Sequence, residues 1–444
     1  MTRSADVAII GGGVVGLSIA YELATQTELS VALFDKEGPG SGTSGRSAGV
    51  ICRHDQGPVY QRLSLIGHAR MQEFAREHEF GFNTWGSLTI VRDPDAFPPK
   101  DDVPEELAAA PSGMYENELL ERDALLQRFP WIAPEGVLGG VFEPNIGFVN
   151  PFELIDLYRR LLKAQPSVTV DYGNPVLELR TDGGLISEVA TRRGLWRAKT
   201  VVNASGAWAN KVAALAGTSL HITPQRMNVA LATAYDDEPG PVPLHGAPSM
   251  SWEGDGVWCR GEIGGALLFG QHRDKTRADQ GTADPDHFDK LPDAGFAPSL
   301  VPQLETFYRL PKSKVVSGWT CVYDTSDDGY PVIGRDGRIS NLVHAVGMNG
   351  HGMTIHAGVA RCVRAILAED STKIDISDVL PSEGQLDFSV LRPSRFEEGQ
   401  PLALRGDSGG HGIPSGRTDS HGRGLDSSPL RTGVSRSEGV PDGG

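Results

Sequence analysis

The stretch that decides the fold is DVAIIGGGVVG, residues 6–16. Its four consecutive apolar residues, 7–10, predict a strand buried on both faces of a parallel sheet. Gly11, Gly13 and Gly16 follow at the G-x-G-x-x-G spacing of dinucleotide-binding turns. Gly11 permits the tight turn, Gly13 lets a pyrophosphate approach the backbone, and Gly16 lets the next helix pack close to the strand. We therefore expect a dinucleotide at this turn.

The residues that follow this turn support the same interpretation. A helix is expected to start near Val14, which places Val14 and Val15 in its first turn, where free N–H groups and the positive end of the helix dipole bind phosphate. A second apolar run, residues 30–34, ends at Asp35, the position of an acid that binds ribose hydroxyls, and Lys36 follows it. The alternative is a glycine-rich surface turn with a chance aspartate. The order of strand, glycines, helix, strand and acid argues against it.

The composition is that of a globular protein with room for two domains. The chain has 444 residues, of which 39% are hydrophobic and 22% charged, and its net charge of −16 disfavours nucleic acid as a partner. Its four cysteines show neither a CxxC pair nor metal-ligand spacing, so we expect reduced thiols, no metal site and a cytoplasmic location. The sequence has no run of about 18 apolar residues, so we expect no membrane span. The apolar stretch near the N-terminus suits the nucleotide fold rather than a secretory peptide.

Three further turns rich in small residues are candidates for ligand contact. The first lies in residues 37–55, where Ser44, Arg46, Ser47 and Gly49 can fold back along a dinucleotide, whereas residues 38–42 also fit a flexible loop. The second, NASGAWA at 203–209, ends a predicted strand over 200–204, and its Gly206 permits close approach of the backbone to a ligand. The third, GMNGHGM at 347–353, joins a predicted strand over 342–347 to a predicted helix over 354–368.

The other periodic segments predict a scaffold of helices and strands. Helices are expected over 60–79, 119–129 and 151–164, the last capped by Asn150 with Pro151 at its first position. Strands are expected over 85–91, 168–172, 176–179, 188–192, 228–234, 256–260, 266–271 and 315–323. From residue 393 to 444 the chain is mostly Gly, Ser, Asp, Arg and Pro. We expect this tail to be disordered because it has few large apolar residues to bury.

Four patches of sequence, in their order and separation, carry a family resemblance. They are the N-terminal glycine turn with Asp35, TSGRSAG at 43–49, VVNASGAWA at 201–209, and YPVIG…AVGMNGHGM between 330 and 353. Together they resemble the glycine/sarcosine/D-amino acid oxidase (DAO-type) family of FAD flavoenzymes over residues 6–368, and most of all its monomeric sarcosine oxidase-like members.

The resemblance implies an α/β fold with two domains. A Rossmann-like FAD-binding domain with a parallel sheet is expected from 1–84, 145–225 and 315–392. A substrate domain of α+β type, built on a mixed or antiparallel sheet, is expected from 85–144 and 226–314. Residues 393–444 are left as the disordered tail.

The resemblance also carries cofactor-binding roles over to matching residues. The residues expected to bind FAD are Gly11, Gly13, Val14, Val15, Gly16, Asp35, Lys36, Ser44, Arg46, Ser47, Gly49, Val176, Gly206, Trp208, Cys321, Asn349, Gly350, His351, Gly352, Met353 and Thr354. Val176 matches a residue whose backbone meets the adenine, and the turn around His351 matches the one beside the flavin ring. A helix N-terminus at 353–354 also suits flavin physically, because it stabilises the negative charge that reduced flavin carries near N1 and the C2 oxygen.

Arg53, His272 and His351 are the catalytic candidates. The spacing of Arg53 resembles that of the arginine that binds the substrate carboxylate in sarcosine oxidases, although it also fits a surface salt bridge. His272 resembles a substrate-pocket histidine or is a structural residue at a strand end, and His351 is either a packed turn residue or a group that takes part in the chemistry. Cys321 stands where sarcosine oxidases bond a cysteine to the flavin, and the alternative is a small buried hydrophobe.

Two positions depart from the sarcosine oxidases. Thr354 stands where they have a carboxylate-binding lysine and Leu268 where they have an oxygen-activating lysine, so a dehydrogenase or a slow oxidase is also compatible. The expected reaction is hydride transfer to flavin N5 from the carbon next to nitrogen in an amino acid or a secondary or N-methyl amine, giving an imine that hydrolyses. The electron acceptor is O₂, or a protein or quinone. The alternatives are an NAD(P)H-dependent flavin enzyme, a flavin subunit of a larger amine-oxidising complex, and a flavoprotein with a binding role.

Overall fold

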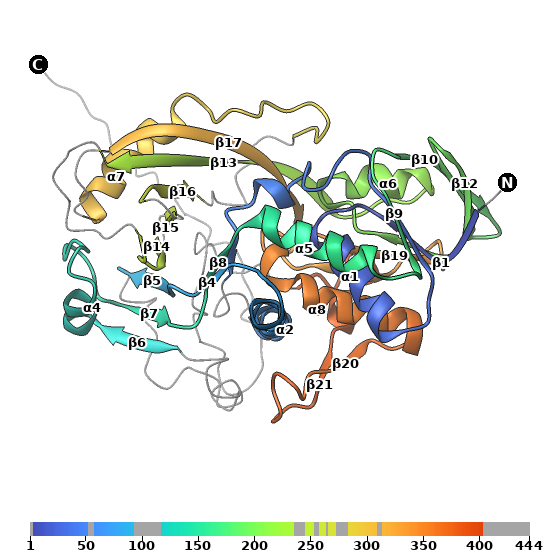
Figure 1. Ribbon diagram of the computed structural model, residues 1–444, viewed down its shortest axis with the longest axis horizontal. Helices are drawn as coiled ribbons and strands as arrows, with labels where there is room; N and C mark the ends of the chain where they lie inside the picture. The colour runs from blue at the N-terminus through green and yellow to red at the C-terminus, as the bar shows by residue number, and fades with distance from the viewer. Residues whose placement is uncertain are drawn as a thin grey trace, which may run out of the picture. The chain divides into compact units, whose positions relative to one another are not determined.

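Two large β-sheets carry the described part of the chain (Figure 1). The computed structural model describes residues 3–51, 57–92, 117–234, 245–252, 257–262, 265–271, 283–308 and 313–402. Within these ranges each large sheet has eight strands. None of the helices in them has the length and the apolar character needed to cross a bilayer.

The first sheet has the parallel centre that the sequence predicts. Its strands are β1 (Arg3–Ile10), β2 (Val31–Phe34), β9 (Val168–Asp171), β10 (Val176–Asp182), β11 (Leu185–Thr191), β12 (Gly194–Asn203), β18 (Val332–Arg335) and β19 (Leu342–Val346). Strand β1 lies between β12 and β2 and is parallel to both, and β9 and β19 extend the parallel set on either side. Val7 and Ile9 pack into one apolar cluster, and Ala8 and Ile10 pack into another on the opposite face. The strand is therefore buried on both sides.

Helices cover both faces of this sheet. They are α1 (Val14–Gln26), α2 (Gly57–Glu77), α5 (Pro151–Lys163), α6 (Ala209–Leu215) and α8 (Gly352–Arg364). Helices α1, α2, α5 and α8 share the apolar cluster of one face, and α6 packs on the other (Figure 1). Asn150 caps α5 by accepting the N–H of Phe152 at 3.0 Å, with Pro151 at the first position, as expected.

Helices α2 and α8 cross with their backbones in contact. A Cβ atom at Gly67 of α2 would lie 1.7 Å from the carbonyl oxygen of Thr354, and one at Gly358 of α8 would lie 2.8 Å from the Cα of Leu63. A side chain at either glycine would force the helices apart. The crossing therefore fixes the first turn of α8 against α2.

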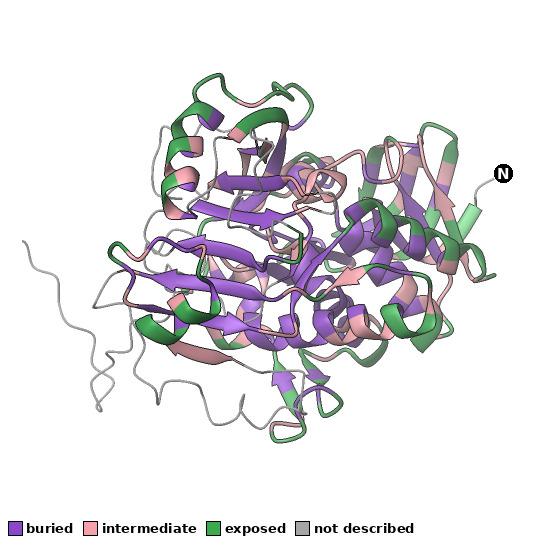
Figure 2. Ribbon diagram, turned by 60° about the vertical axis from the view of Figure 1, so that its left-hand side comes forward, coloured by how far each residue is buried: buried purple, intermediate pink, exposed green. Residues whose placement is uncertain are grey.

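The second sheet is mixed. Its strands are β5 (Ser87–Val91), β6 (Glu118–Glu121), β7 (Gly139–Glu143), β13 (Ile222–Ala234), β14 (Ser249–Trp252), β15 (Val257–Gly261), β16 (Leu267–Gln271) and β17 (Ser313–Ser326). Among these described strands β5 and β14 run parallel, and the other neighbours are antiparallel. Helices α4 (Arg122–Arg128) and α7 (Phe296–Phe307) close an apolar core on one face, and their outer sides are exposed (Figure 2). The domain limits given above stay a prediction.

Shorter elements complete the fold. Strands β3 (Val50–Ile51), β4 (Phe82–Asn83) and β8 (Gly147–Val149) form a three-stranded sheet, and β20 (Lys373–Asp375) pairs with β21 (Gln385–Asp387). The helix expected over 119–129 is shorter than predicted. Residues 118–121 form β6 because they pair with β7 at the sheet edge, and this pairing overrides their helical propensity.

The start of the tail is ordered, which corrects the prediction of disorder from residue 393. Pro393–Arg395 forms a 3₁₀ turn, and Arg395 is 0% exposed. Its guanidinium makes a two-point ion pair with Asp328, with Nε–Oδ2 at 2.7 Å and Nη2–Oδ1 at 2.8 Å. Composition indicated disorder because a single buried arginine with a distant partner leaves no compositional signal. Residues 403–444 of the tail lie outside the described residues.

Candidate functional site

The turns singled out in the sequence meet at one edge of the first sheet. They follow the carboxyl ends of the parallel strands β1, β2, β12 and β19 (Figure 1). Gly11 N–H donates to the carbonyl of Phe34 at 2.8 Å, and Ala204 N–H donates to the carbonyl of Ile10 at 2.9 Å. The carboxyl edge of a parallel sheet is where such folds bind ligands. These turns therefore lie at the edge of the sheet where a dinucleotide is expected to bind.

The first glycine turn leaves no room for side chains. Gly11 has φ +115°, and a Cβ there would lie 2.4 Å from the carbonyl oxygen of Ala204. A Cβ at Gly16 would lie 1.9 Å from the carbonyl oxygen of Gly11, and one at Gly13 would lie 3.0 Å from Ser44 Oγ. Gly13 precedes α1 without a side-chain cap, so the first N–H groups of the helix face this turn. A pyrophosphate is the kind of group that such a cradle accepts.

Two predicted ligands of the dinucleotide are held beside this turn. The Asp35 carboxylate accepts the N–H of Gly12 at 2.8 Å through Oδ2 and the N–H of Glu37 at 2.8 Å through Oδ1. Ser44 Oγ accepts the N–H of Val14 at 3.1 Å. Both side chains are thus oriented by the backbone that a phosphate or ribose would contact.

Tyr172 lies beside Asp35 and was not found from the sequence. A Cβ at Gly12 would lie 3.0 Å from its Cε1, and its buried hydroxyl has no hydrogen-bond partner among the described residues. Burial raises the pKa of Tyr172 to about 12, although the charge of Arg159 opposes the shift. A buried hydroxyl without a partner is rare and points to a missing group. The signal available in the sequence was its position at the end of the strand predicted over 168–172.

Lys36 and Trp208 meet at the same edge but are joined to a third residue. Lys36 Nζ lies 4.1 Å from the centre of the Trp208 ring. Asp286 accepts the Trp208 Nε1–H at 2.8 Å and pairs with Lys36 and with Lys211. Burial alone would raise the pKa of Asp286, but its hydrogen bonds to Lys211, Lys36 and Trp208 hold it below its usual value. Residue 286 precedes α7, so this cluster ties the segment before α7 to the first sheet.

Val176 and Gly206 occupy the remaining predicted positions near this edge. Val176 opens β10 and is half-buried. Gly206 has φ +55° and opens a 3₁₀ turn, and nothing lies within 4 Å of the place of its missing Cβ. The open space at Gly206 leaves room for a ligand beside the backbone.

The loop 44–49 is fixed against the second sheet. Trp319 Nε1–H donates to the carbonyl of Arg46 at 2.9 Å, and Arg260 Nε–H donates to the carbonyl of Ala48 at 2.8 Å. Ser47 Oγ accepts the N–H of Gly49, which has φ +69°, at 3.0 Å. The predicted flavin loop therefore lies where the two large sheets meet.

The second glycine turn is held by buried polar contacts. Gly350 has φ +89°, and a Cβ there would lie 2.4 Å from the ring of Tyr323. Asn349 Oδ1 accepts the N–H of Ser326 at 3.0 Å. Asp324 accepts the N–H groups of residues 347 and 348 at 2.7 and 3.1 Å, and burial raises its pKa to about 6. Tyr323 and Asp324 were not found from the sequence, although Tyr323 follows Cys321 at the two-residue spacing of one strand face.

The same turn begins helix α8. His351 precedes the helix, and its ring lies 5.4 Å from the ring of Tyr60 in an edge-to-face contact. Gly352 is the first helical residue, and a Cβ there would lie 3.9 Å from Cγ2 of Val15 in α1. Met353 and Thr354 are buried in the first turn. The N-termini of α1 and α8 are therefore neighbours, and the dipole of each favours negative charge in front of it.

The proposed covalent residue is buried as a neutral thiol. Cys321 is 1% exposed and pairs across the sheet with Met227. Burial raises its pKa to about 12, and the charge of Arg46 opposes the shift. The thiolate needed for bond formation is thus disfavoured here. Two catalytic candidates, Arg53 and His272, lie outside the described residues.

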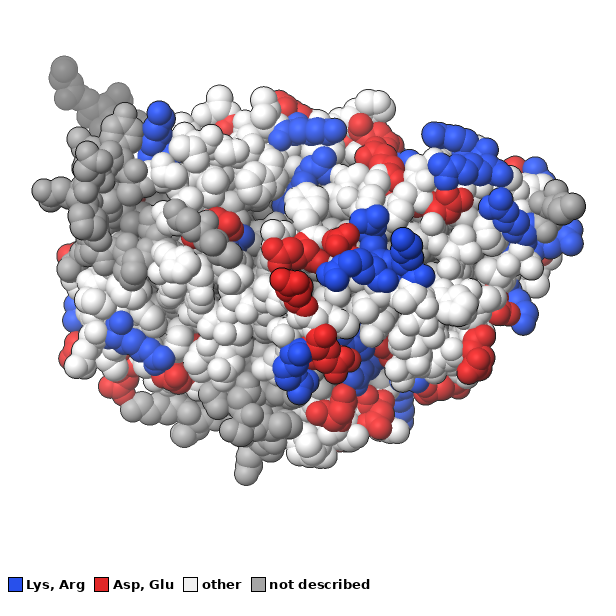
Figure 3. Space-filling model, in the orientation of Figure 1, with Lys and Arg blue, Asp and Glu red and all other residues white. Residues whose placement is uncertain are grey.

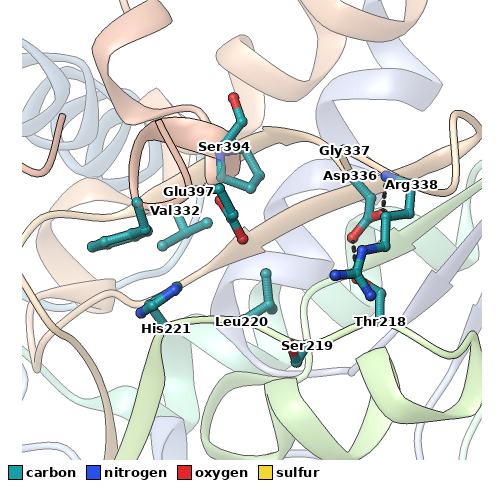
Figure 4. A pocket seen from close by; sticks show the side chains of 12 residues that line it. Thr218, Ser219, Leu220, His221, Val332, Asp336, Gly337, Arg338, Ser394 and Glu397 are labelled. Carbon is teal, nitrogen blue, oxygen red and sulfur yellow. Dashed lines mark hydrogen bonds between the residues drawn. The ribbon is translucent and has the colours of Figure 1, made fainter. Parts of the chain in front are cut away.

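A cavity of about 270 Å³ lies elsewhere (Figure 4). It is lined by residues 218–221, by residues 332 and 336–338, and by residues 393, 394, 396 and 397, which include no predicted site residue. Its most buried carboxylate, Asp336, accepts the Thr218 hydroxyl at 2.9 Å and the Arg338 N–H at 2.8 Å and contacts His344 Nε2 at 3.0 Å. Because these internal contacts satisfy the Asp336 carboxylate, we do not count it as a ligand-binding group of the cavity.

On the face drawn in Figure 3, the charged side chains of the described residues do not single out another site. Figure 3 shows basic and acidic side chains interspersed on one face. Ion pairs of the described residues include Arg159–Asp156 at 2.9 Å and Arg180–Glu188 at 2.9 Å. Exposed pairs of this kind contribute little to stability or recognition.

The convergence of turns fits a flavin dinucleotide. The glycine cradle and the N–H groups of α1 suit a pyrophosphate, Asp35 suits a ribose, and the orphaned hydroxyl of Tyr172 lies beside them. The N-terminus of α8 and the loop 44–49 then flank the place left for a ring system. The chemistry of these donors matches FAD, while the role of each residue stays a prediction.

Comparisons with known proteins agree with this geometry. A family model described as FAD dependent oxidoreductase, DAO, matches residues 6–366. Glycine oxidase of Geobacillus kaustophilus (strain HTA426) is 26% identical over 395 residues, which cover 85% of this chain and 96% of that protein. Monomeric sarcosine oxidase of Bacillus sp. (strain B-0618) is 25% identical over 427 residues, 91% of this chain and 100% of that protein.

Solved structures show the same fold. L-proline dehydrogenase from P. horikoshii superposes with a TM-score of 0.73 at 20% identity, over 90% of this chain and 100% of that one. Glycine oxidase from Geobacillus kaustophilus superposes with a TM-score of 0.66 at 23% identity, over 85% and 99%. Because the family model spans most of the sequence, the chain belongs to the DAO family of FAD-dependent oxidoreductases.

Proposed function

We propose that this FAD-dependent oxidoreductase oxidises the CH–NH bond of an amino acid or of a secondary or N-methyl amine. When bound, FAD supplies the chemistry by accepting a hydride at N5 from the carbon next to nitrogen, and the resulting imine hydrolyses in water. The observation that carries the proposal is the pairing of the α1 and α8 N-termini beside a loop that is hydrogen-bonded to the second sheet. Relatives named glycine oxidase and monomeric sarcosine oxidase support this substrate class.

The chain acts through positioning and electrostatics. The turn at Gly11 and the first N–H groups of α1 hold the pyrophosphate, and Asp35 holds the ribose. The first turn of α8, with His351 before it, stabilises the negative charge of the reduced ring. The second sheet covers the reacting atoms and excludes water, and the amine enters in its neutral form so that no dedicated base is required.

The electron acceptor is O₂, or a protein or quinone. Leu268 is 1% exposed and lies on the face of the second sheet that meets the flavin loop, next to Trp258 and Val229. Leu268 itself offers no positive charge to developing superoxide, and the neighbouring cation, Arg260, is engaged by the carbonyl of Ala48 and by Glu262. We therefore propose slow reoxidation by air and faster reoxidation by another acceptor. A cytoplasmic location stays a prediction from the sequence.

We propose that FAD is bound without a covalent link, because Cys321 is 1% exposed, pairs with Met227 inside the second sheet and is kept as a neutral thiol by burial. Acid precipitation of the purified protein tests this point. Yellow colour in the supernatant is the expected result. Yellow colour that stays in the pellet of the wild-type chain and is lost in Cys321→Ser would establish the bond instead.

The deciding experiment is anaerobic reduction of the bound flavin by a panel of amino acids, N-methyl amines and simple amines, followed by admission of air. Bleaching by at least one amine is expected, with reoxidation that is slow in air and fast with an artificial quinone. Bleaching by NADPH in the absence of every amine would favour an NAD(P)H-dependent enzyme. A chain that is bleached only after addition of cell extract would point to a subunit of a larger complex.

A further inference from the structure

The segment that precedes α7 is attached to both large sheets. We call this segment, residues 283–293, the strap, and it is the yellow loop drawn above β17 in Figure 1. In the strap only Pro285 is buried, and its other residues are half-buried or exposed. Because it buries little apolar surface, its position depends on polar contacts. These contacts differ in kind between its two ends.

The end next to the second sheet is held through the backbone of the strap. Arg226 of β13 donates Nε–H to the carbonyl of Asp289 at 3.1 Å and Nη2–H to the carbonyl of Leu291 at 2.6 Å. The N–H of Thr320 in β17 donates to the carbonyl of Lys290 at 3.0 Å, and Thr320 is 0% exposed. Opening this end would strand buried polar groups, which is costly. It therefore serves as the fixed end of the strap.

The end next to the first sheet is held by side chains. Asp286 pairs with Lys36 and with Lys211 and accepts the Nε1–H of Trp208 at 2.8 Å. Lys211 also pairs with Asp284 at 2.6 Å, and the side chains in these ion pairs are 33–47% exposed. No backbone hydrogen bond among the described residues joins the strap to the first sheet. Exposed ion pairs are weak and are screened by salt, so this end can open.

The closed strap lies against both sides of the place expected for the adenosine of FAD. Lys36 directly follows Asp35, the expected ribose ligand, and its Nζ lies 4.1 Å from the centre of the Trp208 ring. Trp208 belongs to the same turn as Gly206, beside which the backbone leaves open space. Asp286 joins Lys36 to Trp208 and so bridges the loop after β2 and the turn after β12. A dinucleotide that leaves this edge has to pass the bridge.

We propose that the strap controls the release and entry of FAD by opening at Asp286 and turning about its fixed end. Opening breaks ion pairs and an indole hydrogen bond that are partly in water, and it leaves the contacts of Arg226 and Thr320 intact. Salt weakens the ion pairs and so raises the population of the open strap. This inference rests on the predicted place of a non-covalent FAD and goes beyond the oxidation of amines.

The test follows the release of FAD from the yellow holoenzyme. The holoenzyme is diluted into an excess of another apoflavoprotein that traps free FAD, in about 0.01 M and in about 1 M sodium chloride, where charges are screened over about 30 Å and about 3 Å. The variants are Asp286→Asn, Lys211→Met and the double variant, because neither residue is an expected FAD ligand. Glu118→Gln is the matched control, since Glu118 and its partner Arg128 in the second sheet are 41% and 40% exposed.

Hydrogen exchange supplies a second measurement that does not depend on the flavin signal. It compares a peptide spanning residues 283–291 with a peptide from β17 in the holoenzyme, at both salt concentrations. Salt is expected to accelerate exchange in the strap peptide and to leave the β17 peptide unchanged. A strap peptide whose exchange does not respond to salt overturns the proposal.

Release of FAD from the wild-type chain is expected to be faster at high salt. At low salt Asp286→Asn should release FAD about fivefold faster than the wild type, the order expected for the loss of two half-exposed ion pairs, and salt should add little more. The effect of the double variant should be smaller than the product of the two single effects, because both substitutions remove the pair of Lys211 with Asp286. Glu118→Gln should match the wild type. If Asp286→Asn does not retain FAD during purification, the rate of Lys211→Met decides.

Four results separate this proposal from the proposed function. Equal release from the wild type and Asp286→Asn overturns the strap, and so does a variant that responds to salt as steeply as the wild type. FAD that stays in the acid pellet overturns it as well, because a bonded coenzyme is not exchanged. Flavin that no amine reduces, in a chain whose Asp286→Asn variant still releases FAD faster, overturns the amine oxidation and keeps the strap.

Discussion

Replacing Arg395 with methionine tests whether the ordered start of the tail contributes to the fold. The arginine pairs with Asp328 through two contacts of 2.7 and 2.8 Å, and the exposed fractions of the two side chains are 0% and 1%. Arg395 also donates to the carbonyls of residues 391 and 392 at 2.8 and 3.1 Å. Methionine preserves much of the volume and removes every one of these contacts.

The cost comes mainly from the carboxylate that is left behind. Removing one partner of a buried ion pair typically costs about 3–5 kcal/mol, because an uncompensated charge remains. Unfolding entropy is about 2.1 cal/mol/K per residue, or about 0.8 kcal/mol/K for roughly 400 residues, so the expected loss in Tm is about 4–6 °C. Burial alone would raise the pKa of Asp328, but Arg395 holds it below its usual value. The pair therefore stabilises the fold above the ordinary aspartate pKa, and this contribution is lost as the pH falls.

The same substitution should weaken FAD binding. Asp328 accepts the Ser326 hydroxyl at 3.3 Å, and Ser326 N–H donates to Asn349 in the second glycine turn at 3.0 Å. Loss of Arg395 therefore loosens a chain of contacts that ends at Asn349, in the turn proposed to contact the flavin. The measurements are urea unfolding followed by tryptophan fluorescence, and FAD release followed by the rise in flavin fluorescence.

The control is Arg392→Met, three residues earlier in the chain. Arg392 pairs with Glu398 at the surface, so little or no change is expected. The double variant Asp328→Asn, Arg395→Met should recover part of the stability, since it removes the stranded charge. A loss under about 1 kcal/mol in Arg395→Met at pH 7 would refute the reasoning about buried charge, because it would fall within the range of exposed pairs.

Three further predictions concern the second glycine turn and its helix. Gly350→Ala should cost about 1–3 kcal/mol in backbone strain and displace Tyr323, so FAD titration should show at least a tenfold weaker complex; an unchanged Kd would contradict this. Burial raises the pKa of Asp324 to about 6, so its charge costs stability as the pH rises from about 4 to 6. Asp324→Asn should therefore be relatively more stable at pH 8 than at pH 4, and a parallel shift at both pH values would refute the assignment. Burial lowers the pKa of His356 to about 3, so the fold should lose about 2 kcal/mol of stability on going from pH 8 to pH 5, as the unfolded chain binds the proton. His356→Gln should flatten this part of the profile in urea titrations, and an unchanged slope would show that another group titrates.

The sequence predicted the parts of the site that depend on local sterics. The turn at Gly11 and the turn at Gly350 need φ values and close approaches that a side chain forbids, and such constraints leave glycines at fixed spacing. The burial of Val7–Ile10 could be predicted because a central parallel strand is apolar on both faces.

Long-range partners could not be predicted in this way. Arg260 is paired with the carbonyl of Ala48, which is 212 residues away, and Arg395 is paired with Asp328 across 67 residues. An arginine with polar neighbours in the sequence is predicted to be exposed, because only the folded topology shows which segment covers it. The orphaned hydroxyls of Tyr172 and Ser249 likewise depend on neighbours from other strands.

The place where α2 and α8 touch has a consequence for how this enzyme can vary. The missing side chain of Gly67 leaves space for the carbonyl oxygen of Thr354, one residue after Met353 in the turn proposed to face the flavin ring. We expect a methyl group at position 67 to displace the N-terminus of α8. The helix dipole would then stabilise the negative charge of a reduced coenzyme less, because the interaction weakens with distance. A substitution in α2, which contributes none of the proposed ligands, would thus lower the reduction potential of the flavin.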